Sequence, residues 1–483
     1  EQKNASFDIA TPINRARSHF SEQCRDFAQK HGSGIYRLTL PTGGGKTLAS
    51  LRYALSHAIE YSKKRILFVI PLLSILEQNS AVIRKYIQDE TILTEHHSNM
   101  IKAFETAEEL DQYELLCETW NSPIIITTLV QLLNTLFSHK TTAIRRMSAL
   151  SDSIIIIDEI QSLPKKTTNM FLTALNFLAY GCGATIVLSS ATQPCFNETA
   201  LPLKYSMPAD IVPYEKEFFG VFKRTKMIDQ TSPYGMGIEE LADFSLNVLE
   251  TVSSLLVICN TKGSALKIYT QLKQRCSEHT IFHLSASMCM KHRTDTLARI
   301  NTCLKSKKKM VCISTQLVEA GVDFSFESVL RVQAGMDNIA QAAGRCNRSN
   351  DFGGICSVYV VNLKQNEENL GMLHEIETAQ RCTKQLLYRF AKAPEQYDHD
   401  LLSEKSISEY YQFLFHDEDM KGIFSFPQEL TYGNKENLFD LLADNSKHTQ
   451  RPAFKETYFL NQSFQTAGKL FKVFDENTTD IIV

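Results

Sequence analysis

The chain has 483 residues, of which 43% are apolar and 22% are charged, and its net charge at neutral pH is −3. This length accommodates two or three domains, and the composition is typical of a globular protein. The charge excludes a protein that is basic all over, so any nucleic-acid contact requires a local groove.

The cysteine pattern bears on the cellular compartment. Twelve cysteines are scattered from Cys24 to Cys382 without a C-x-x-C pair, which indicates reduced thiols in a cytoplasmic protein and argues against a structural zinc site. The longest apolar region, 171–188, is broken by glycines and predicts a helix followed by a strand, with no membrane span. The chain begins at Glu1 without a signal sequence, so we expect a split-gene product or a trimmed part of a longer protein.

The first informative stretch is LPTGGGKT at residues 40–47. Residues 34–40 alternate in polarity like a strand, and residues 48–55 carry helix formers. A strand, a glycine turn and a helix aim backbone N–H groups at one point, which makes an anion site. Lys46 would add charge for the outer phosphates, and the Thr47 hydroxyl could hold Mg²⁺. The strict P-loop pattern requires glycine where Leu40 stands, so this pattern leaves a plain glycine-rich turn as an alternative.

Short apolar runs then alternate with helical stretches, which predicts parallel strands covered on both faces. The first series of strands is expected at 65–70, 124–128, 153–157 and 184–189, and the second at 255–259, 280–283, 310–314, 328–332 and 356–361. We therefore expect an α/β protein. Its predicted parts are a first domain (1–210), a connector (211–240), a second domain (241–365) and a mostly helical C-terminal segment (366–483).

A phosphate site that hydrolyses its nucleotide needs carboxylates on a neighbouring strand. The segment SIIIIDEIQSLP places Asp158 and Glu159 at the carboxyl end of a buried strand, where ligands bind in such sheets. We expect Asp158 to hold Mg²⁺ and Glu159 to act as general base toward water. The alternative is a strand that merely ends in an acidic pair.

The segment QAAGRCNR contributes Arg345 and Arg348, three residues apart at an expected helix start. Both guanidinium groups could reach one phosphate cluster as arginine fingers. By themselves they would fit two surface arginines on one helical face equally well.

Taken in order, these segments resemble the motifs of superfamily 2 helicases over residues 14–350. In that family the loop is written Thr-Gly-x-Gly-Lys-Thr, which removes the mismatch at Leu40. The strings TLPTGGGKTLASLRYALSHA, DEIQSLP, SSATQP, VEAGVDF and QAAGRCNR resemble more narrowly the CRISPR-associated helicase–nuclease of type I systems. The resemblance implies two tandem RecA-like parallel-sheet domains that use ATP and Mg²⁺, with the ATP-binding domain at 1–210 and the second helicase domain at 241–365. It also implies that 366–483 is a helical linker followed by the start of a truncated accessory domain.

The resemblance also implies a role for each matching residue. These roles are phosphate binding by Gly43, Gly44, Gly45, Lys46 and Thr47; metal and water handling by Asp158 and Glu159; coupling of hydrolysis to movement by Ser190 and Thr192; nucleotide contact from the second domain by Gly321 and Asp323; completion of the site by Arg345 and Arg348; and contact with the DNA backbone by Thr128, Asn260 and Thr315.

Three positions depart from the family pattern. Arg17 falls where the adenine is bound, but the usual glutamine beside it is missing. Gln161 replaces a histidine of the carboxylate motif, and Ala342 replaces an arginine after Gln341. We expect Gln161 and Gln341 to form a hydrogen bond across the cleft that signals closure of the two domains.

The resemblance predicts an ATP-driven 3′–5′ translocase on single-stranded DNA, recruited to a target opened by an RNA-guided CRISPR surveillance complex. The family's nuclease is a His-Asp domain, and the thirteen histidines form no such cluster, so we expect that domain or subunit to act in cis or in trans. Another superfamily 2 DNA or RNA motor is the alternative. A non-hydrolysing binding protein is disfavoured by the intact Lys46, Asp158, Glu159 and arginines.

Overall fold

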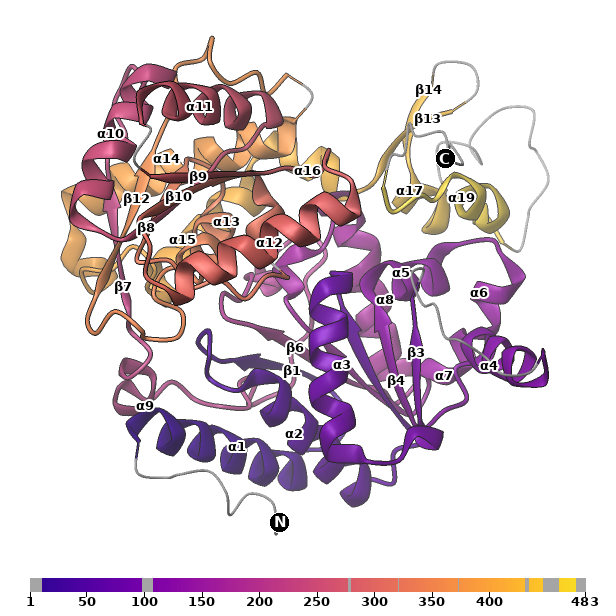
Figure 1. Cartoon of the computed structure of the whole chain (residues 1–483). Helices are drawn as coiled ribbons and strands as arrows, with labels where there is room; N and C mark the ends of the chain where they lie inside the picture. Colours follow the sequence, from indigo (N-terminus) through magenta and orange to yellow (C-terminus); the bar gives the residue numbers. More distant parts are fainter. Residues whose placement is uncertain are drawn as a thin grey trace.

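The computed structural model describes residues 11–97, 107–276, 279–319, 321–371, 373–430, 434–445 and 460–474. Two six-stranded parallel sheets, each flanked by helices, form the bulk of the molecule (Figure 1). They are the two tandem RecA-like domains that the sequence predicts. We call the part from α1 to β6 the first lobe and the part from β7 to β12 the second lobe.

The first lobe builds its sheet in the order β1-β6-β5-β2-β4-β3. The inner strands β2, β4 and β5 contain continuous apolar runs; in β5, four consecutive isoleucines, 154–157, are buried. A fully buried isoleucine contributes about 1.5–3 kcal/mol of hydrophobic stabilisation, which is why such runs occupy the sheet centre. The elements are α1 (Pro12–Lys30), β1 (Ile35–Thr39), α2 (Lys46–Glu60), β2 (Arg65–Ile70), α3 (Leu73–Ile87), β3 (Leu93–His96), α4 (Ala107–Thr119), β4 (Ile124–Thr128), α5 (Leu129–Phe137), α6 (Thr141–Arg145), α7 (Met147–Leu150), β5 (Ser153–Ile157), α8 (Thr168–Gly181) and β6 (Thr185–Ser190).

The second lobe repeats this strand order as β7-β12-β11-β8-β10-β9. Separate apolar clusters cover the two faces of its sheet. The elements, with the connector helix α9, are α9 (Lys216–Gly220), β7 (Thr225–Asp229), α10 (Ile238–Thr251), β8 (Ser254–Ile258), α11 (Lys262–Arg275), β9 (Thr280–Leu284), α12 (Met290–Lys305), β10 (Met310–Ser314), β11 (Ser328–Val332), α13 (Met336–Ala343) and β12 (Cys356–Val361).

One domain boundary expected from the sequence is wrong. The segment 211–240, expected as a connector, contains β7, which is the edge strand of the second sheet and pairs in parallel with β12. Only Met227 of its five residues is buried. An edge strand has one unpaired side and tolerates polar residues, so its composition looked like that of a loop.

The C-terminal segment is mostly helical, as expected, but it also contains a two-stranded antiparallel sheet. Part of the expected accessory domain lies outside the described residues. The elements are α14 (His374–Lys392), α15 (Glu404–His416), α16 (Glu418–Phe424), β13 (Pro427–Leu430), β14 (Asn434–Asn437), α17 (Leu438–Leu442) and α19 (Phe464–Leu470).

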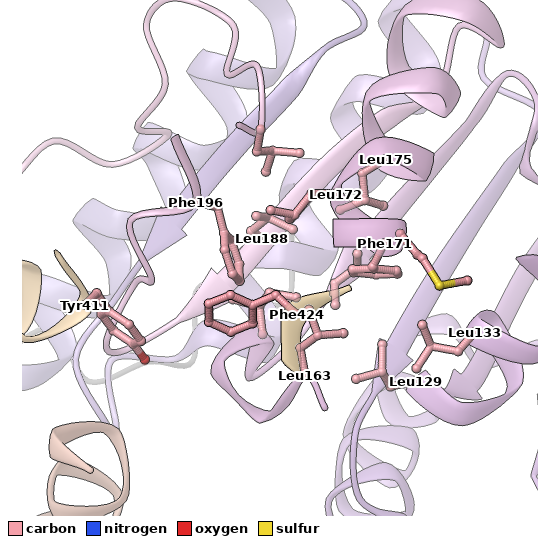
Figure 2. Packing of buried hydrophobic residues seen from close by; sticks show 14 of the residues in the cluster. Leu129, Leu133, Leu163, Phe171, Leu172, Leu175, Leu188, Phe196, Tyr411 and Phe424 are labelled. Carbon is pink, nitrogen blue, oxygen red and sulfur yellow. The ribbon is translucent and has the colours of Figure 1, made fainter. Parts of the chain in front are cut away.

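This C-terminal segment packs against both lobes. Tyr411 and Phe424 join the apolar cluster that contains Phe171 and Phe196 of the first lobe (Figure 2). On the second lobe, the Thr383 hydroxyl donates to the carbonyl of Ala334 at 2.7 Å. The helices α14 to α16 therefore limit how the two lobes are placed, and the cleft between the lobes is formed by the ends of the two sheets.

Candidate nucleotide site between the two lobes

The glycine loop joins β1 to α2 and ends in a helix whose N-terminus is open. Gly43 and Gly45 both have φ of 84°, which is the left-handed region where glycine is favoured. Gly45 is the N-cap of α2; no side chain caps this end, and the first turn contains no acidic residue. The first N–H groups of α2 and the positive end of its dipole are thus available to an anion.

A cavity of about 390 Å³ lies in front of this loop and is lined by both lobes. The residues singled out from the sequence that line it are Arg17, Gly43, Gly45, Lys46, Thr47, Asp158, Glu159, Gln161, Thr192, Gly321, Gln341, Arg345 and Arg348. Gly44 closes the loop instead, through its N–H to the carbonyl of Pro41 at 2.9 Å. The tertiary structure therefore brings together segments that are up to 330 residues apart in the chain.

Lys46 and the two carboxylates form the charged centre of the cavity. The Lys46 Nζ lies 2.6 Å from Glu159 Oε1, and the Gln161 amide donates to the other Glu159 oxygen at 2.5 Å. Burial alone would raise the pKa of Glu159, but Lys46 and Gln161 hold it below its usual value. Burial opposes the charge of Lys46, yet Glu159 and Asp158 raise its pKa. Both groups are therefore charged at neutral pH.

Asp158 is held by neighbours that present further oxygen atoms. Its carboxylate accepts from the Ser189 hydroxyl at 2.9 Å and from the Asn79 amide at 3.3 Å. The Thr47 hydroxyl donates to the Asn79 amide oxygen at 3.0 Å. Burial raises the pKa of Asp158, although Lys46 opposes this effect. Carboxylate, hydroxyl and amide oxygens are hard ligands of the kind that Mg²⁺ prefers, so Thr47 and Asp158 fit the ion expected from the sequence.

The second lobe contributes two arginines. Arg345 donates from Nε and Nη2 to the carbonyls of Val318 and Glu319, while its buried Nη1 has no partner among the residues that the structure describes. Arg348 forms an ion pair with Asp323 at 2.6 Å. The unpaired Nη1 of Arg345, in a residue that lines the cavity, is a donor that a phosphate oxygen would satisfy.

The lobes are in contact at this cavity. Gln78 of α3 donates its amide to Asp323 of the second lobe. Gly321, with φ of 80°, lies so close to Ser74 that an added Cβ would be 1.8 Å from the Ser74 hydroxyl oxygen. Asp323 does not line the cavity; it acts on it through Arg348. A side chain at position 321 would push the two lobes apart.

The expected hydrogen bond between Gln161 and Gln341 is not formed in this structure. Both residues line the cavity, but the Gln161 amide forms its hydrogen bonds within the first lobe. Its nitrogen donates to Glu159, and its oxygen accepts from the Ser190 hydroxyl at 2.6 Å. Ser190 is fully buried and also accepts from the N–H of Thr192 at 2.9 Å. A chain of contacts thus runs from the carboxylate to the SSAT segment inside one lobe.

The residues expected to contact DNA lie away from the cavity and are buried. Thr128 caps α5 by accepting from the Gln131 N–H, and Thr315 is 7% exposed at the end of β10. Asn260 is 4% exposed; its amide donates to the carbonyl of Gln333 and accepts from Arg331 at 2.7 Å. A DNA strand would reach the Asn260 side chain only if this internal network opened, so a DNA-contact role for Asn260 is not supported by its position.

Arg17 of α1 reaches the loop from outside. Its Nε donates to the carbonyl of Gly43 at 2.9 Å, and its Nη1 donates to Asn14 at 3.3 Å. The residue lines the cavity, yet its guanidinium is engaged mainly with the glycine loop. The missing adenine-reading glutamine is not replaced by Arg17 in this arrangement.

Sequence reasoning missed Asn79, Gln78 and Arg224 as parts of the site. Gln78 ends the stretch PLLSILEQ, which begins directly after β2 and continues into α3, so the start of this stretch at a strand end was a usable signal. Asn79 is the next residue of the same helix. Arg224 lies in the segment that was expected to be a connector, and no local pattern distinguishes it. Its contacts depend on two loops that are far apart in the chain.

The repeated sheets, the glycine loop and the arginine-bearing second lobe resemble a helicase core of superfamily 2. Residues 24–200 match the family model of DEAD/DEAH box helicases, and residues 251–351 match that of the C-terminal part of the CRISPR-associated nuclease/helicase Cas3.

More narrowly, the chain is similar to Cas3. It is 26% identical to the CRISPR-associated nuclease/helicase Cas3 of Haloferax volcanii, over 66% of this chain and 45% of that protein. It is 21% identical to the Methanothermobacter thermautotrophicus protein of the same name, over 65% of this chain and 38% of that protein. The chain thus spans less than half the length of these two relatives.

Solved structures show the same fold. The crystal structure of T. fusca Cas3-AMPPNP matches with a TM-score of 0.65 at 18% identity, over 82% of this chain and 52% of that chain. A chain of a CRISPR RNA-guided surveillance complex in a pre-nicking state matches with a TM-score of 0.57 at 17% identity, over 80% of this chain and 49% of that chain. The resemblance to the CRISPR-associated helicase–nuclease family is therefore confirmed in sequence and in fold.

Helices in the described ranges are too short or too polar to cross a bilayer. Within the same ranges, His, Cys, Asp and Glu side chains do not gather in groups of three or more that could hold a metal ion.

Proposed function

We propose that the chain is an ATP-driven motor that moves 3′ to 5′ along single-stranded DNA and serves type I CRISPR interference in the cytoplasm. The observation that carries this proposal is the shared cavity. One lobe supplies a lysine, two carboxylates and an open helix N-terminus, and the other lobe supplies two arginines. A site divided in this way links nucleotide chemistry to the relative position of the lobes, which a motor requires.

Binding of ATP begins with the first lobe. The N–H groups at the start of α2 and the Lys46 ammonium bind the phosphates, and Thr47 and Asp158 would hold Mg²⁺. The ion, when bound, supplies charge neutralisation at the phosphate oxygens. Ser189 and Asn79 keep the Asp158 carboxylate in place through their hydrogen bonds.

Glu159 is the group that activates water. Without nucleotide, its carboxylate is paired with Lys46 at 2.6 Å. A triphosphate competes for the same ammonium, so binding of the substrate frees one Glu159 oxygen to accept the proton of a water. Gln161 retains the other oxygen through its amide and keeps the carboxylate oriented.

The arginines of the second lobe complete the site on closure. Arg345 has an unpaired Nη1, and Arg348 would leave Asp323 to reach the charge that develops on the γ-phosphate. Because the Ser190–Thr192 segment contacts Gln161, loss of the γ-phosphate is transmitted to the first lobe as well. Movement along DNA would follow from repeated closure and opening.

The decisive experiment measures ATP hydrolysis with Mg²⁺ alone, with single-stranded DNA and with RNA. We expect strong stimulation by DNA of any sequence, and DNA affinity that decreases with salt, because the contacts are to the backbone. Unwinding of a duplex with a 3′ overhang but not a 5′ overhang tests the direction. Equal stimulation by RNA, or a strong sequence preference on naked DNA, favours the other superfamily 2 motors.

We further propose that cleavage of DNA requires a His-Asp nuclease domain or subunit in cis or in trans. The purified chain should leave labelled single-stranded DNA intact in Mn²⁺, Ni²⁺ or Co²⁺, with or without ATP. Cleavage that survives Lys46→Ala and disappears with a chelator would reveal a nuclease site within this chain. Retention of the chain by an RNA-guided surveillance complex on target DNA tests the proposed partner.

A further inference from the structure

Arg224 stands where the chain passes from the first lobe into the second. It directly precedes β7, and its backbone carbonyl accepts from the N–H of Cys356 at 2.9 Å, which anchors it to the start of β12. Its position belongs to none of the helicase motifs recognised in the sequence. Its side chain nevertheless contacts the backbone of Thr42 and of Arg348, two residues whose loops border the cavity.

The guanidinium of Arg224 bridges the two lobes through backbone atoms. Its Nη2 donates to the carbonyl of Thr42, in the glycine loop of the first lobe, at 2.6 Å. Its Nη1 donates to the carbonyl of Arg348, in the arginine loop of the second lobe. One side chain thus connects the loop that holds phosphate with the loop that carries Arg345 and Arg348.

The bridge also orients the glycine loop. A peptide unit is planar and trans, so the N–H of Gly43 points opposite to the Thr42 carbonyl and therefore away from Arg224. Gly43 itself leaves space for the guanidinium: an added Cβ would lie 3.0 Å from Arg224 Nη2. This close approach gives a reason, besides the positive φ, for glycine at position 43.

The surroundings of Arg224 are strongly positive. Burial and the neighbouring Arg17 and Arg348 lower its pKa. Three carbonyl acceptors, those of Thr42, Arg348 and Phe222, compensate this guanidinium without neutralising it. The arrangement is suited to a site that is completed by the negative charge of a triphosphate.

We propose that Arg224 is an interlobe clasp, a positioning residue that holds the arginine loop at a set distance from the glycine loop. The proposal rests on the proposed ATP hydrolysis for its kinetic consequences, but the clasp itself exists without nucleotide. Arg224 does not touch the phosphates; it acts through the backbone of Thr42 and Arg348. It should therefore affect turnover more than ATP binding.

Two variants separate a bridge from a simple positive charge. Arg224→Ala removes both, whereas Arg224→Lys keeps the charge but replaces the planar fork with a single point donor that cannot span two carbonyls in the same way. Lys223→Ala is the matched control. It removes the adjacent positive charge, whose ammonium is half exposed and pairs with Asp400 at 2.8 Å.

The kinetic test measures kcat and KM for ATP with single-stranded DNA. For both Arg224 variants we expect kcat to decrease about tenfold and KM to change less than about threefold, because phosphate binding by Lys46 and α2 persists. Lys223→Ala should match the unchanged protein. Recovery of kcat in Arg224→Lys would reduce the residue to a charge, and an unchanged kcat in Arg224→Ala would overturn the clasp.

The second test is hydrogen exchange of the nucleotide-free protein. Amides at residues 42–47 and 346–350 should exchange faster in both Arg224 variants than in Lys223→Ala, because both loops lose a shared anchor. Unchanged exchange there would contradict the proposal whatever the kinetics. Absence of ATP hydrolysis by the unchanged protein would instead contradict the proposed function, and the exchange result would still decide the clasp.

Discussion

The two lobes have the same strand order, yet they differ at the N-terminus of the helix that follows the first strand. In the first lobe, β1 leads into α2, whose N-terminus has no side-chain cap and no acidic residue in its first turn. In the second lobe, β7 leads into α10, whose first turn contains Glu239 and Glu240. The Glu240 carboxylate accepts from the N–H of Gly237 at 2.5 Å, so this helix end is satisfied by its own sequence.

This difference explains why one lobe is suited to bind phosphate. A carboxylate at a helix N-terminus takes the place that an anionic ligand would take, and a second negative charge is repelled. The second lobe instead contributes positive charge, through two arginines on the loop after α13. Of the two lobes with this architecture, the first is therefore suited to bind phosphate, and the second is suited to complete the same site.

The largest expected effect comes from removing the charged centre of the first lobe. Lys46→Ala and Glu159→Gln should each reduce turnover about a thousandfold or more, and Glu159→Gln should still bind nucleotide because its proposed role is chemistry on water. Steady-state ATPase and binding of a fluorescent nucleotide measure the two effects. Lys364→Ala is the matched control, since Lys364 lies at the corresponding helix end of the second lobe, 3.1 Å from Glu240. Normal turnover in Glu159→Gln would remove that residue from the base role.

The contribution of the second lobe is the next largest. Arg348→Ala should lower kcat about a hundredfold or more with a small change in nucleotide affinity, as for other arginine fingers. Arg275→Ala removes a comparable arginine–aspartate pair of the same lobe, at 2.5 Å from Asp243 and away from the cavity, and should leave kcat unchanged. Equal losses in the two variants would show a general effect on the lobe instead of a role in catalysis.

Acid stability should also distinguish the lobes. His57 of α2 is fully buried between the carbonyl of Ala28 and the hydroxyl of Thr185, and burial lowers its pKa to about 4. The unfolded chain takes up this proton near pH 6.5, so stability decreases as pH falls below 6.5 and levels off below 4.

Between pH 7 and pH 5 this histidine should cost the first lobe about 2 kcal/mol of unfolding free energy. The single tryptophan, Trp120, is buried in that lobe, so its fluorescence during urea unfolding follows the lobe directly. His57→Gln should lose this part of the pH dependence. An identical pH dependence in the variant would mean that other groups control acid unfolding.

The smallest effect is expected from uncapping the second lobe. Glu240→Ala should increase hydrogen exchange in the first turn of α10, because the Gly237 N–H loses its acceptor, without altering ATP turnover. Gain of nucleotide binding by the second lobe in this variant would show that the cap alone keeps that lobe from binding phosphate. We expect no gain, since the lysine at this helix end, Lys364, follows β12 and is not part of the first turn of α10, whereas Lys46 is the first residue of α2.

Many of the residues that line the cavity were predictable from local sequence. The glycine turn before Lys46, the carboxylates after the isoleucine strand and the arginines of QAAGRCNR lie where the cavity needs them, because the carboxyl ends of parallel strands meet at one edge of a sheet. Apolar runs such as 153–157 predicted the inner strands for the same reason. Strands buried on both faces require continuous apolar sequence.

Tertiary structure decided what local sequence could not. The polar strand β7 joins the second sheet only because β12 offers it a free edge. The Asn260 side chain is held inside the second lobe by hydrogen bonds to Arg331 and Gln333. Gln161 forms a hydrogen bond with Ser190 of its own lobe instead of with Gln341. Arg224 can bridge the lobes only because their packing brings the carbonyls of Thr42 and Arg348 close together. Hydrogen-bond partners of this kind depend on which residues are close in space after folding. A local residue pattern does not specify which distant segments come close to one another.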